Sequence, residues 1–240
     1  SYNDEVLQQK ANNFLAAVHF HKEQVGVSFL DISTGEFLLA EGNEGEIDKL
    51  LQTFQPSEVL FQKQFRKRFE EAFGKSYFTY MLEDWVFHLD YANDILTKHF
   101  DTKTLKGFGV SSLQFGTIAA GVALHYLSDT QHQQLQHINS LSRIDTKDYV
   151  WLDRFTIRNL ELIYSSNEGA VTLADVLDQT ISPMGGRLMK RWISLPLKEV
   201  KPIQNRLSIV EYLLSDSELS SFLRGQIKQI GDLERLISKV

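Results

Sequence analysis

Acidic side chains in the first part of the chain are the strongest candidates for chemistry. Asp31 ends one apolar run, Glu36 and Glu41 belong to the next, and Asp84 and Asp90 follow later. A two-metal nuclease requires several carboxylates that converge on one edge of a sheet. Asp31 is followed by Ile32 and then by Ser33-Thr34-Gly35, however, and an Asp before such a turn commonly accepts a hydrogen bond from the turn's backbone. We therefore interpret Asp31 as a turn residue and keep a metal-dependent nuclease as the alternative.

Histidines are the next candidates, because all seven lie before residue 138 and none lies in the last 100 residues. His19 and His21 alternate along a strand-like run and would point to the same side of a sheet, where imidazoles can bind a metal ion. No third ligand stands at a spacing typical of a metal site. His125 lies in an apolar helical stretch and is predicted to be a hydrogen-bonded core residue. We predict no metal site and interpret the set as surface or core histidines: His19, His21, His88, His99, His125, His132 and His137.

Motifs that bind nucleotides or carry an activated serine are absent from the sequence. There is no GxxxxGK[ST] phosphate loop and no G-x-S-x-G elbow. A basic–aromatic cluster of a kind that can bind nucleic acid does occur. Glu70 and Glu71 follow it directly, which favours a solvated helix face with buried phenylalanines. The cluster consists of Lys63, Phe65, Arg66, Lys67, Arg68 and Phe69.

The elements that would position these residues alternate between strand and helix in the first half. Residues 25–32 and 36–40 flank Ser33-Thr34-Gly35 and predict a β-hairpin. The order permits a ribonuclease H-like mixed sheet, although a flavodoxin-like sheet would give similar signals. We predict strands at 14–20, 25–32, 36–40 and 59–61, helices at 44–54, 63–73, 85–100 and 115–126, and an exposed connection at 128–137.

The second half is predicted to be helical throughout. Thr172, with Asp175 at the capping-box offset, predicts a helix that begins at Leu173. Ser182-Pro183 predicts the start of another helix, which runs to Pro196. Further helices are expected from residue 202 and at 219–230 and 233–240.

Two more predictions concern this helical half. Met184, Leu188 and Trp192 recur on one helix face, which predicts that they pack in a core. At residues 142–148 the charge balance changes, and the spacing of the apolar residues changes from mixed strand and helix patterns to helix patterns alone. The expected fold is therefore an α/β domain at 1–145 followed by an all-α segment at 146–240.

Charge is distributed unevenly along the chain. Its formal net charge is −6, but residues 1–149 contain 20 acidic and 13 basic side chains, and residues 150–240 contain 11 and 12. An acidic module repels the phosphate backbone, whose neutralisation dominates nucleic-acid affinity. We therefore expect weak or no direct DNA binding.

Composition also limits the cellular setting. The sequence contains no Cys, which excludes disulfides and thiolate metal sites and suits a reducing cytoplasm. It contains no apolar run that approaches the roughly 20 residues of a membrane span, and no export signal at its start. The first residue is not Met and the last residues, LERLISKV, continue a helical pattern. We expect a cytoplasmic protein, without membrane contact, of which this chain is one part.

Several sequence blocks, taken in order, resemble the MutS family of DNA mismatch-recognition proteins. The blocks FLDISTGEF (29–37), PSEVLF (56–61), KGFGV (106–110), AAG (119–121) and LHYLSDTQ (124–131) resemble the connector domain. The blocks LDRFTIRNLEL (152–162), TLADVLDQTISPMGGRLMKRWISLPL (172–197) and GDLERLISKV (231–240) resemble the opening of the core, or lever, domain. The resemblance therefore extends over nearly the whole chain.

The resemblance implies a ribonuclease H-like connector without nuclease activity, followed by the first core helices. In the family, the connector couples the ATP state to the DNA-binding parts and offers a surface to MutL. The Phe-x-Glu module that reads mismatched duplex DNA and the ATPase domain that binds ATP and Mg lie outside these 240 residues. For this chain alone, the resemblance implies no catalysis and no cofactor or metal. The whole protein is expected to be a homodimer.

Two expectations concern partners. The polar stretch after residue 128 adjoins a packed helix and looks like a loop, so we expect MutL to contact it, either in the whole protein or with this chain alone. The proposed contact residues are Asp129, Thr130, Gln131, Gln133 and Gln134. The helices at 213–240 would normally pack in a longer helical core, so we expect loose ends or crystal dimers there.

Overall fold

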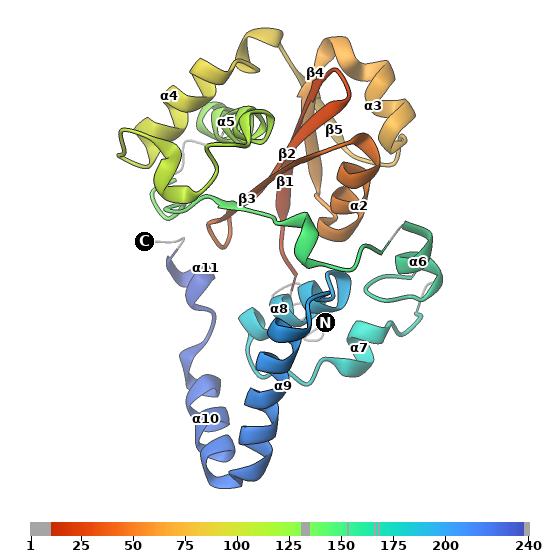
Figure 1. Cartoon of the computed structure of the whole chain (residues 1–240), viewed down its shortest axis with the longest axis vertical. Coiled ribbons are helices and arrows are strands. Elements are labelled where there is room, and N and C mark those ends of the chain that lie inside the picture. The colour runs from red at the N-terminus through yellow and green to blue at the C-terminus, as the bar shows by residue number, and fades with distance from the viewer. Residues whose placement is uncertain (1–10, 131–134, 153, 166, 168, 238–240) are drawn as a thin grey trace. The chain divides into compact units, whose positions relative to one another are not determined.

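The computed structural model describes residues 11–130, 135–152, 154–165, 167 and 169–237. The chain divides into two compact units, one built on Asn13–Asp145 and the other on Thr146–Leu236. We call them the sheet unit and the helical unit, and describe each by itself (Figure 1). The fold is therefore α/β in the first part and helical in the second.

A mixed sheet of six strands organises the sheet unit within the described residues. Its order is β5-β4-β1-β2-β3-β6. The first three strands form an antiparallel meander, while β4 runs parallel to β1, β5 parallel to β4 and β6 parallel to β3. The strands are β1 (Phe14–His21), β2 (Gln24–Asp31), β3 (Glu36–Gly42), β4 (Glu58–Gln62), β5 (Thr79–Leu82) and β6 (Ser142–Arg143).

The predicted hairpin between β2 and β3 is confirmed. Gly35 has φ +75°, a left-handed conformation that glycine adopts without steric cost. Its amide donates to the carbonyl of Asp31 at 2.8 Å, which closes the turn. The turn sets the register in which Asp31 pairs with Glu36.

Helices cover both faces of the sheet (Figure 1). One face carries α2 (Glu44–Phe54) and α3 (Arg66–Phe73), and the other carries α4 (Leu89–His99) and α5 (Gln114–Thr130). Asn43 begins α2 with a reciprocal capping box to Glu46. The fold explains the Gly and Ala content of α5, because these small residues let the helix lie close to the strands.

The contact between α5 and β2 is unusually close at one point. A Cβ atom on Gly26 would lie 2.1 Å from the backbone of Phe115 and 2.5 Å from the amide nitrogen of Gly116. The carboxylate of Glu41 accepts hydrogen bonds from the N–H groups of Phe115 and Gly116 at 2.5 and 3.0 Å. Glu41 therefore caps the N-terminus of α5, where a negative charge is favourable.

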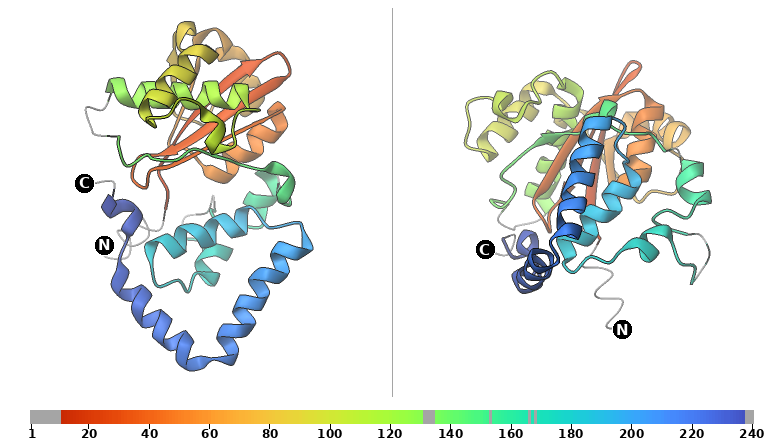
Figure 2. Two further views of the ribbon diagram at one scale, coloured as in Figure 1. Left: turned by 60° about the vertical axis from the view of Figure 1, so that its left-hand side comes forward. Right: turned by 60° about the horizontal axis from the view of Figure 1, so that its bottom comes forward.

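The helical unit starts its helices with side-chain caps. Thr172 accepts a hydrogen bond from the backbone of Asp175 and Ser182 accepts one from Gly185, as predicted. Pro183 occupies the first turn of its helix, as predicted. The helices are α6 (Arg154–Asn159), α7 (Leu173–Leu177), α8 (Pro183–Ser194), α9 (Val200–Ser215), α10 (Ser217–Ile230) and α11 (Leu233–Ile237). The helices α9 and α10 meet at a bend at Asp216 and diverge from it (Figure 2).

The prediction that the apolar stripe on α8 packs in a core is wrong. Leu188 is 46% exposed and Trp192 is 40% exposed, and Arg206 lies over the Trp192 ring at 3.6 Å from its centroid. Neither α9 nor α10 buries a residue, although both contain many apolar side chains. Helical period identifies an apolar face correctly, but it does not supply the surface that would cover that face.

Other differences from the predictions occur at short or irregular elements. No strand was predicted at β5, whose residues are mostly exposed. The stretch predicted as one helix at 85–100 is a 3-10 turn, Asp84–Val86, followed by α4, because His88 has extended backbone. The predicted connection at 128–137 is wrong at its start, where Ser128 to Thr130 form the last turn of α5. Within the described residues, no helix is both long and apolar enough to cross a membrane.

Candidate functional site

The predicted partner-binding stretch begins at the C-terminal end of α5. Asp129 and Thr130 lie in its last turn and are exposed. The hydroxyl of Thr130 donates to the carbonyl of Tyr126 at 2.6 Å, so it helps to close that turn. Gln131, Gln133 and Gln134 lie outside the described residues. The structure thus places the first two predicted contact residues on the surface, at a helix end.

Asp129 belongs to a short polar chain that reaches into the sheet unit. The hydroxyl of Tyr91 and Nδ1 of His125 form a hydrogen bond of 2.7 Å. On the other side of the ring, Nε2 of His125 lies 3.5 Å from Oδ2 of Asp129. Burial and then the Asp129 charge raise the pKa of Tyr91. His125 is buried and hydrogen-bonded, which confirms the prediction of a core histidine.

Aromatic rings surround this chain. Trp85 packs edge-on against both Tyr91 and His125, with ring centroids 5.3 Å apart in each case. Tyr80, on β5, contacts Tyr126, whose hydroxyl donates to both carboxylate oxygens of Glu58 at 3.1 and 3.2 Å. Burial, followed by the Glu58 charge, raises the pKa of Tyr126 to about 12. A tyrosine held in its protonated form in this way serves as a hydrogen-bond donor rather than as a base.

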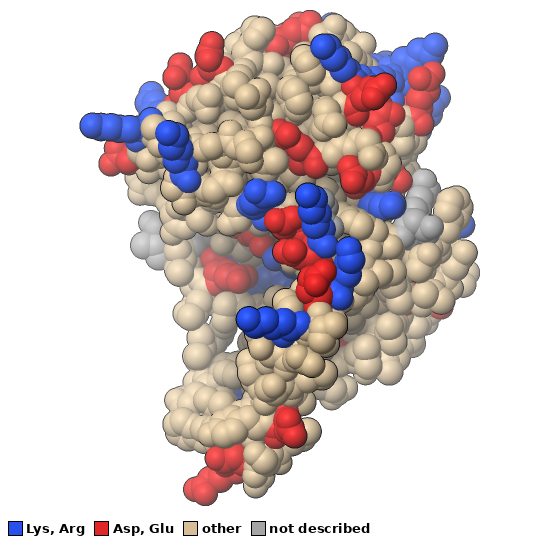
Figure 3. Space-filling view, in the orientation of Figure 1, with Lys and Arg blue, Asp and Glu red and all other residues tan. Residues whose placement is uncertain are grey.

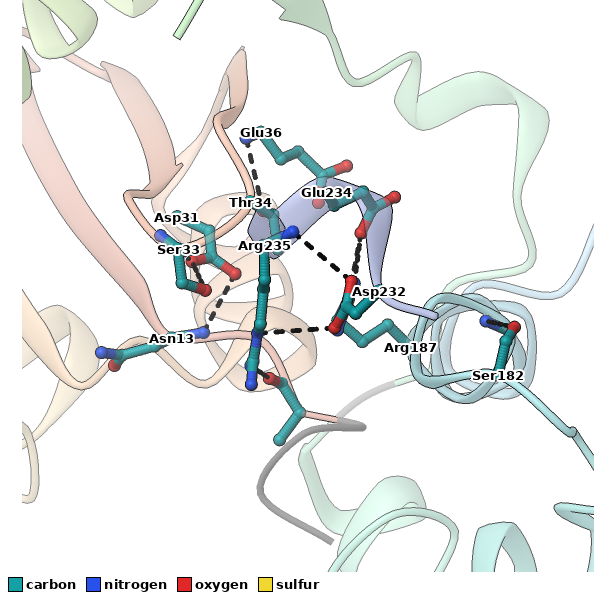
Figure 4. A network of polar contacts seen from close by, with 12 residues as sticks. Asn13, Asp31, Ser33, Thr34, Glu36, Ser182, Arg187, Asp232, Glu234 and Arg235 are labelled. Atoms are coloured by element: carbon teal, nitrogen blue, oxygen red, sulfur yellow. Dashed lines mark hydrogen bonds and ion pairs between the residues drawn. The ribbon is translucent and has the colours of Figure 1, made fainter. Parts of the chain in front are cut away.

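The candidate nuclease carboxylates have structural roles. Asp31 accepts hydrogen bonds from the amide and hydroxyl of Ser33 at 2.9 and 2.6 Å, and from the amide of Asn13 at 3.2 Å (Figure 4). These contacts confirm the turn interpretation of Asp31. Glu41 caps α5, and Asp84 and Asp90 lie at the starts of other helices. Among the residues that the structure describes, no three His, Asp or Glu side chains form a group that could hold a metal ion.

His19 and His21 stack on phenylalanines. The His19 ring is stacked on Phe87 at 5.9 Å and the His21 ring on Phe115 at 4.7 Å. Burial lowers the pKa of His19 to about 4, with a further contribution from the nearby His21. His19 is therefore neutral at physiological pH, and its environment is that of a core residue.

The basic–aromatic cluster lies on a 3-10 turn, Lys63–Phe65, and the start of α3, and its α3 cations pair with acidic neighbours. Arg66 pairs with Glu70 at 3.1 Å, and Arg68 pairs with Glu44 at 2.7 Å. Phe69 is buried, as predicted, while the charged side chains remain on the surface. Figure 3 shows acidic side chains beside the basic ones on the part of the surface that it displays. This arrangement fits a solvated helix face better than a phosphate-binding surface.

The strongest ionic cluster lies in the helical unit, where sequence reasoning did not place one. Arg187 on α8 is only 4% exposed. Its guanidinium donates to both carboxylate oxygens of Asp232 at 2.7 and 2.9 Å, and to Glu234 at 2.5 Å (Figure 4). Burial alone would lower the pKa of Arg187, but its bonds to Asp232 and Glu234 outweigh burial and raise that pKa. The bonds from Arg187 correspondingly lower the pKa of Asp232.

This three-residue cluster, which we call the Arg187 clamp, joins the start of α8 to the segment that precedes and begins α11. The partners are separated by 45 and 47 residues in the sequence. Arg235 adds a contact at the same place, because its guanidinium donates to the carbonyl of Ala11 at 2.7 Å. The only sequence signal for the clamp was the presence of these residues in blocks that resemble one family.

Comparisons with known proteins agree with this architecture. The family described as MutS domain II matches residues 13–139, and the family described as MutS domain III matches residues 155–240. Over 238 residues, the chain is 58% identical to the DNA mismatch repair protein MutS of Christiangramia forsetii. The matched region covers 99% of this chain and 27% of that relative. Relatives with the same name from Flavobacterium johnsoniae and Cytophaga hutchinsonii are 58% and 55% identical over the whole chain, each matched over 28% of its length.

The chain thus spans a little over a quarter of the length of these curated relatives. The two family matches fall one on each unit of the structure, in the order expected from the sequence blocks. The chain belongs to the MutS family of DNA mismatch repair proteins, and its two units match domains II and III of that family.

Proposed function

We propose that the chain is the coupling segment of a mismatch repair protein, formed by a connector domain and the start of the core, or lever, domain. The observation that carries this proposal is the succession of the two domain matches along the chain. In the whole protein, mismatched duplex DNA, ATP and Mg would be bound by other domains, within a homodimer. A segment between such sites couples them when it has two packings of similar free energy that the ligands favour differently.

We also propose that the sheet unit is ribonuclease H-like but not a nuclease. An antiparallel meander of β1 to β3, continued by β4 and β5 in parallel, supports the first part. The turn role of Asp31 and the cap role of Glu41 support the second, because these carboxylates are engaged by backbone amides. A protein that repairs bacterial DNA works in the cytoplasm, which is the location that we propose.

The partner surface that we propose for MutL starts at Asp129 and Thr130 and continues through residues 131–134. Its support is the exposed position of Asp129 at the end of α5, beside the ring contacts of Trp85 and Tyr91. A carboxylate at a helix C-terminus is unfavourable for the helix dipole, which points to a role other than helix stability.

The test is a titration of the purified chain against the ATPase region of MutL, with a mismatched DNA duplex as the parallel ligand at the same low salt. We expect binding to MutL and not to DNA, and loss of MutL binding in Asp129→Lys. The matched control is Asp94→Lys, which reverses an exposed charge on α4 and should leave affinity unchanged. Equal MutL affinity for both variants would remove this surface from the proposal.

Two other outcomes separate the parts of the proposal. Binding to neither ligand would leave a passive connector, with docking limited to the ATP-bound whole protein. Tight binding to DNA would contradict the charge argument and direct attention to Lys63 and Lys67, two lysines of the basic–aromatic cluster.

A further inference from the structure

The free edge of the sheet at β5 has features that the proposed coupling role does not use. Among the residues that the structure describes, β5 is the outermost strand on its side and pairs only with β4 (Figure 1). The amide of Val59 donates to the carbonyl of Phe78, and Val59 is paired in register with Thr79. In a parallel ladder, successive residues bond to opposite sides. The backbone groups of Thr79 and Met81 therefore point away from β4, toward the free edge.

This edge is apolar as well as open. Phe78 is 72% exposed, Tyr80 49% and Trp85 55%, and Met81 is also exposed. Natural edge strands are commonly protected by lysines, prolines or bulges, and residues 78–82 contain neither lysine nor proline. An open edge with large apolar side chains is a surface on which another extended segment can add as a further strand.

The ring contacts make one face of this edge rigid. Tyr80 contacts Tyr126 at 5.2 Å, and Trp85 is held against Tyr91 and His125. These contacts restrict the rotamers open to the two rings, which lowers the entropy lost on binding. Aromatic faces attract cations as well as apolar groups.

The charges near the edge decide which partner fits. Glu83 and Asp84 follow β5 directly, and Glu58 lies beside Tyr126. The basic residue on the other side, Lys75, is already paired with Glu70 at 3.4 Å. A second copy of this chain would bring the same acidic groups to the interface, whereas a segment with lysines or arginines would neutralise them.

We propose that the β5 edge binds an extended segment of another protein that alternates apolar and basic residues. Its backbone pairs with Thr79 and Met81, and its basic side chains lie near the rings of Tyr80 and Trp85 and the carboxylates of Glu83 and Asp84. The proposal does not depend on MutL docking, because it is carried by the strand edge and not by residues 129–134.

The test uses the whole 240-residue chain and a fluorescein-labelled peptide of eight residues that alternates valine and lysine. Fluorescence anisotropy measures its affinity at low salt, and hydrogen exchange measures protection of the Thr79 and Met81 amides. Two comparison peptides carry glutamate in place of lysine, or proline in place of the two central valines. We expect both to bind about tenfold more weakly or worse, and we expect protection of the two amides only with the first peptide.

Variants of the chain complete the test. Thr79→Pro removes an outward N–H without removing a bond to β4, so it should abolish peptide binding and leave the melting temperature nearly unchanged. Trp85→Ala should weaken binding about threefold to tenfold, while Phe155→Ala, which removes another exposed ring, should not. Equal binding of the lysine, glutamate and proline peptides would overturn the proposal. Unchanged exchange at Thr79 and Met81, or protection that grows with chain concentration alone, would also overturn it.

Discussion

Replacing Gly26 by alanine should loosen α5 from the sheet. The new Cβ would lie 2.1 Å from Phe115 backbone atoms, and ordinary contact begins at 3.4 Å, so the start of α5 must retreat. The obstructing atoms are backbone and cannot change rotamer, so we expect the upper end of the cost of overpacking, about 3 kcal/mol. Weakened bonds from the Phe115 and Gly116 amides to Glu41 add to this cost.

The free energy of unfolding of the sheet unit should therefore fall by about 3 to 4 kcal/mol, and its melting temperature by roughly 10 °C. Trp85 is the only tryptophan of the sheet unit, so its fluorescence reports that unit alone when Trp151 and Trp192 are replaced by phenylalanine. Faster hydrogen exchange at Phe115 and Gly116 should accompany the loss. The control is Gly107→Ala, where no atom lies within 4 Å of the new Cβ and the change should stay within about 0.5 kcal/mol. A loss below about 1 kcal/mol in Gly26→Ala would refute the reasoning, because overpacking against backbone costs at least that much.

Two further predictions concern ionisation. Arg187→Met should destabilise the helical unit by about 2 to 3 kcal/mol in urea denaturation, because Asp232 and Glu234 lose their closest cation and Asp232 keeps only the longer ion pair with Arg235 at 3.8 Å. Because the pKa of Asp232 is lowered in the folded chain, Asp232 stabilises the fold above the ordinary Asp pKa, and this contribution is lost as the pH falls through the folded pKa. The free energy of unfolding of Arg187→Met should therefore depend less on pH in the acid range. An unchanged pH dependence would argue against the clamp. The pKa of His19 is about 4 in the folded chain, below its ordinary value of 6.5. Between these two values the unfolded chain binds a proton that the folded chain does not. The free energy of unfolding should therefore rise with pH across that window, by at most about 3 kcal/mol. His19→Gln should flatten that rise in urea titrations at pH 4.5 and 7, and an equally steep rise would assign it to other groups.

Local signals were sufficient to predict much of the fold. The hairpin turn at Gly35 and the caps at Thr172 and Ser182 depend on neighbours within a few residues, and the structure contains all three. The turn role of Asp31 and the buried position of His125 followed from the same local reasoning.

Features that depend on distant residues could not be predicted in this way. Glu41 caps a helix that begins more than 70 residues later, and Arg187 finds its partners 45 and 47 residues away. The strand β5 is stabilised by pairing with β4 and not by its own pattern, so its sequence alone gives little indication of it. For the exposed stripe of Leu188 and Trp192, the sequence identifies the apolar face but not what lies against it.

The Arg187 clamp has a consequence for how the helical unit tolerates changes in length. It fastens the start of α8 to the residues just after α10, so the intervening chain, including α9 and α10, leaves and returns at one fixed point. Asp216, where α9 ends and α10 begins, takes no part in the clamp. Removing one whole turn from α9 and one from α10 together would therefore keep both arms in phase and leave the clamp intact, whereas shortening one arm alone would pull Asp232 out of reach of Arg187. Insertions and deletions in this region should therefore be accepted when α9 and α10 change length by the same number of helical turns.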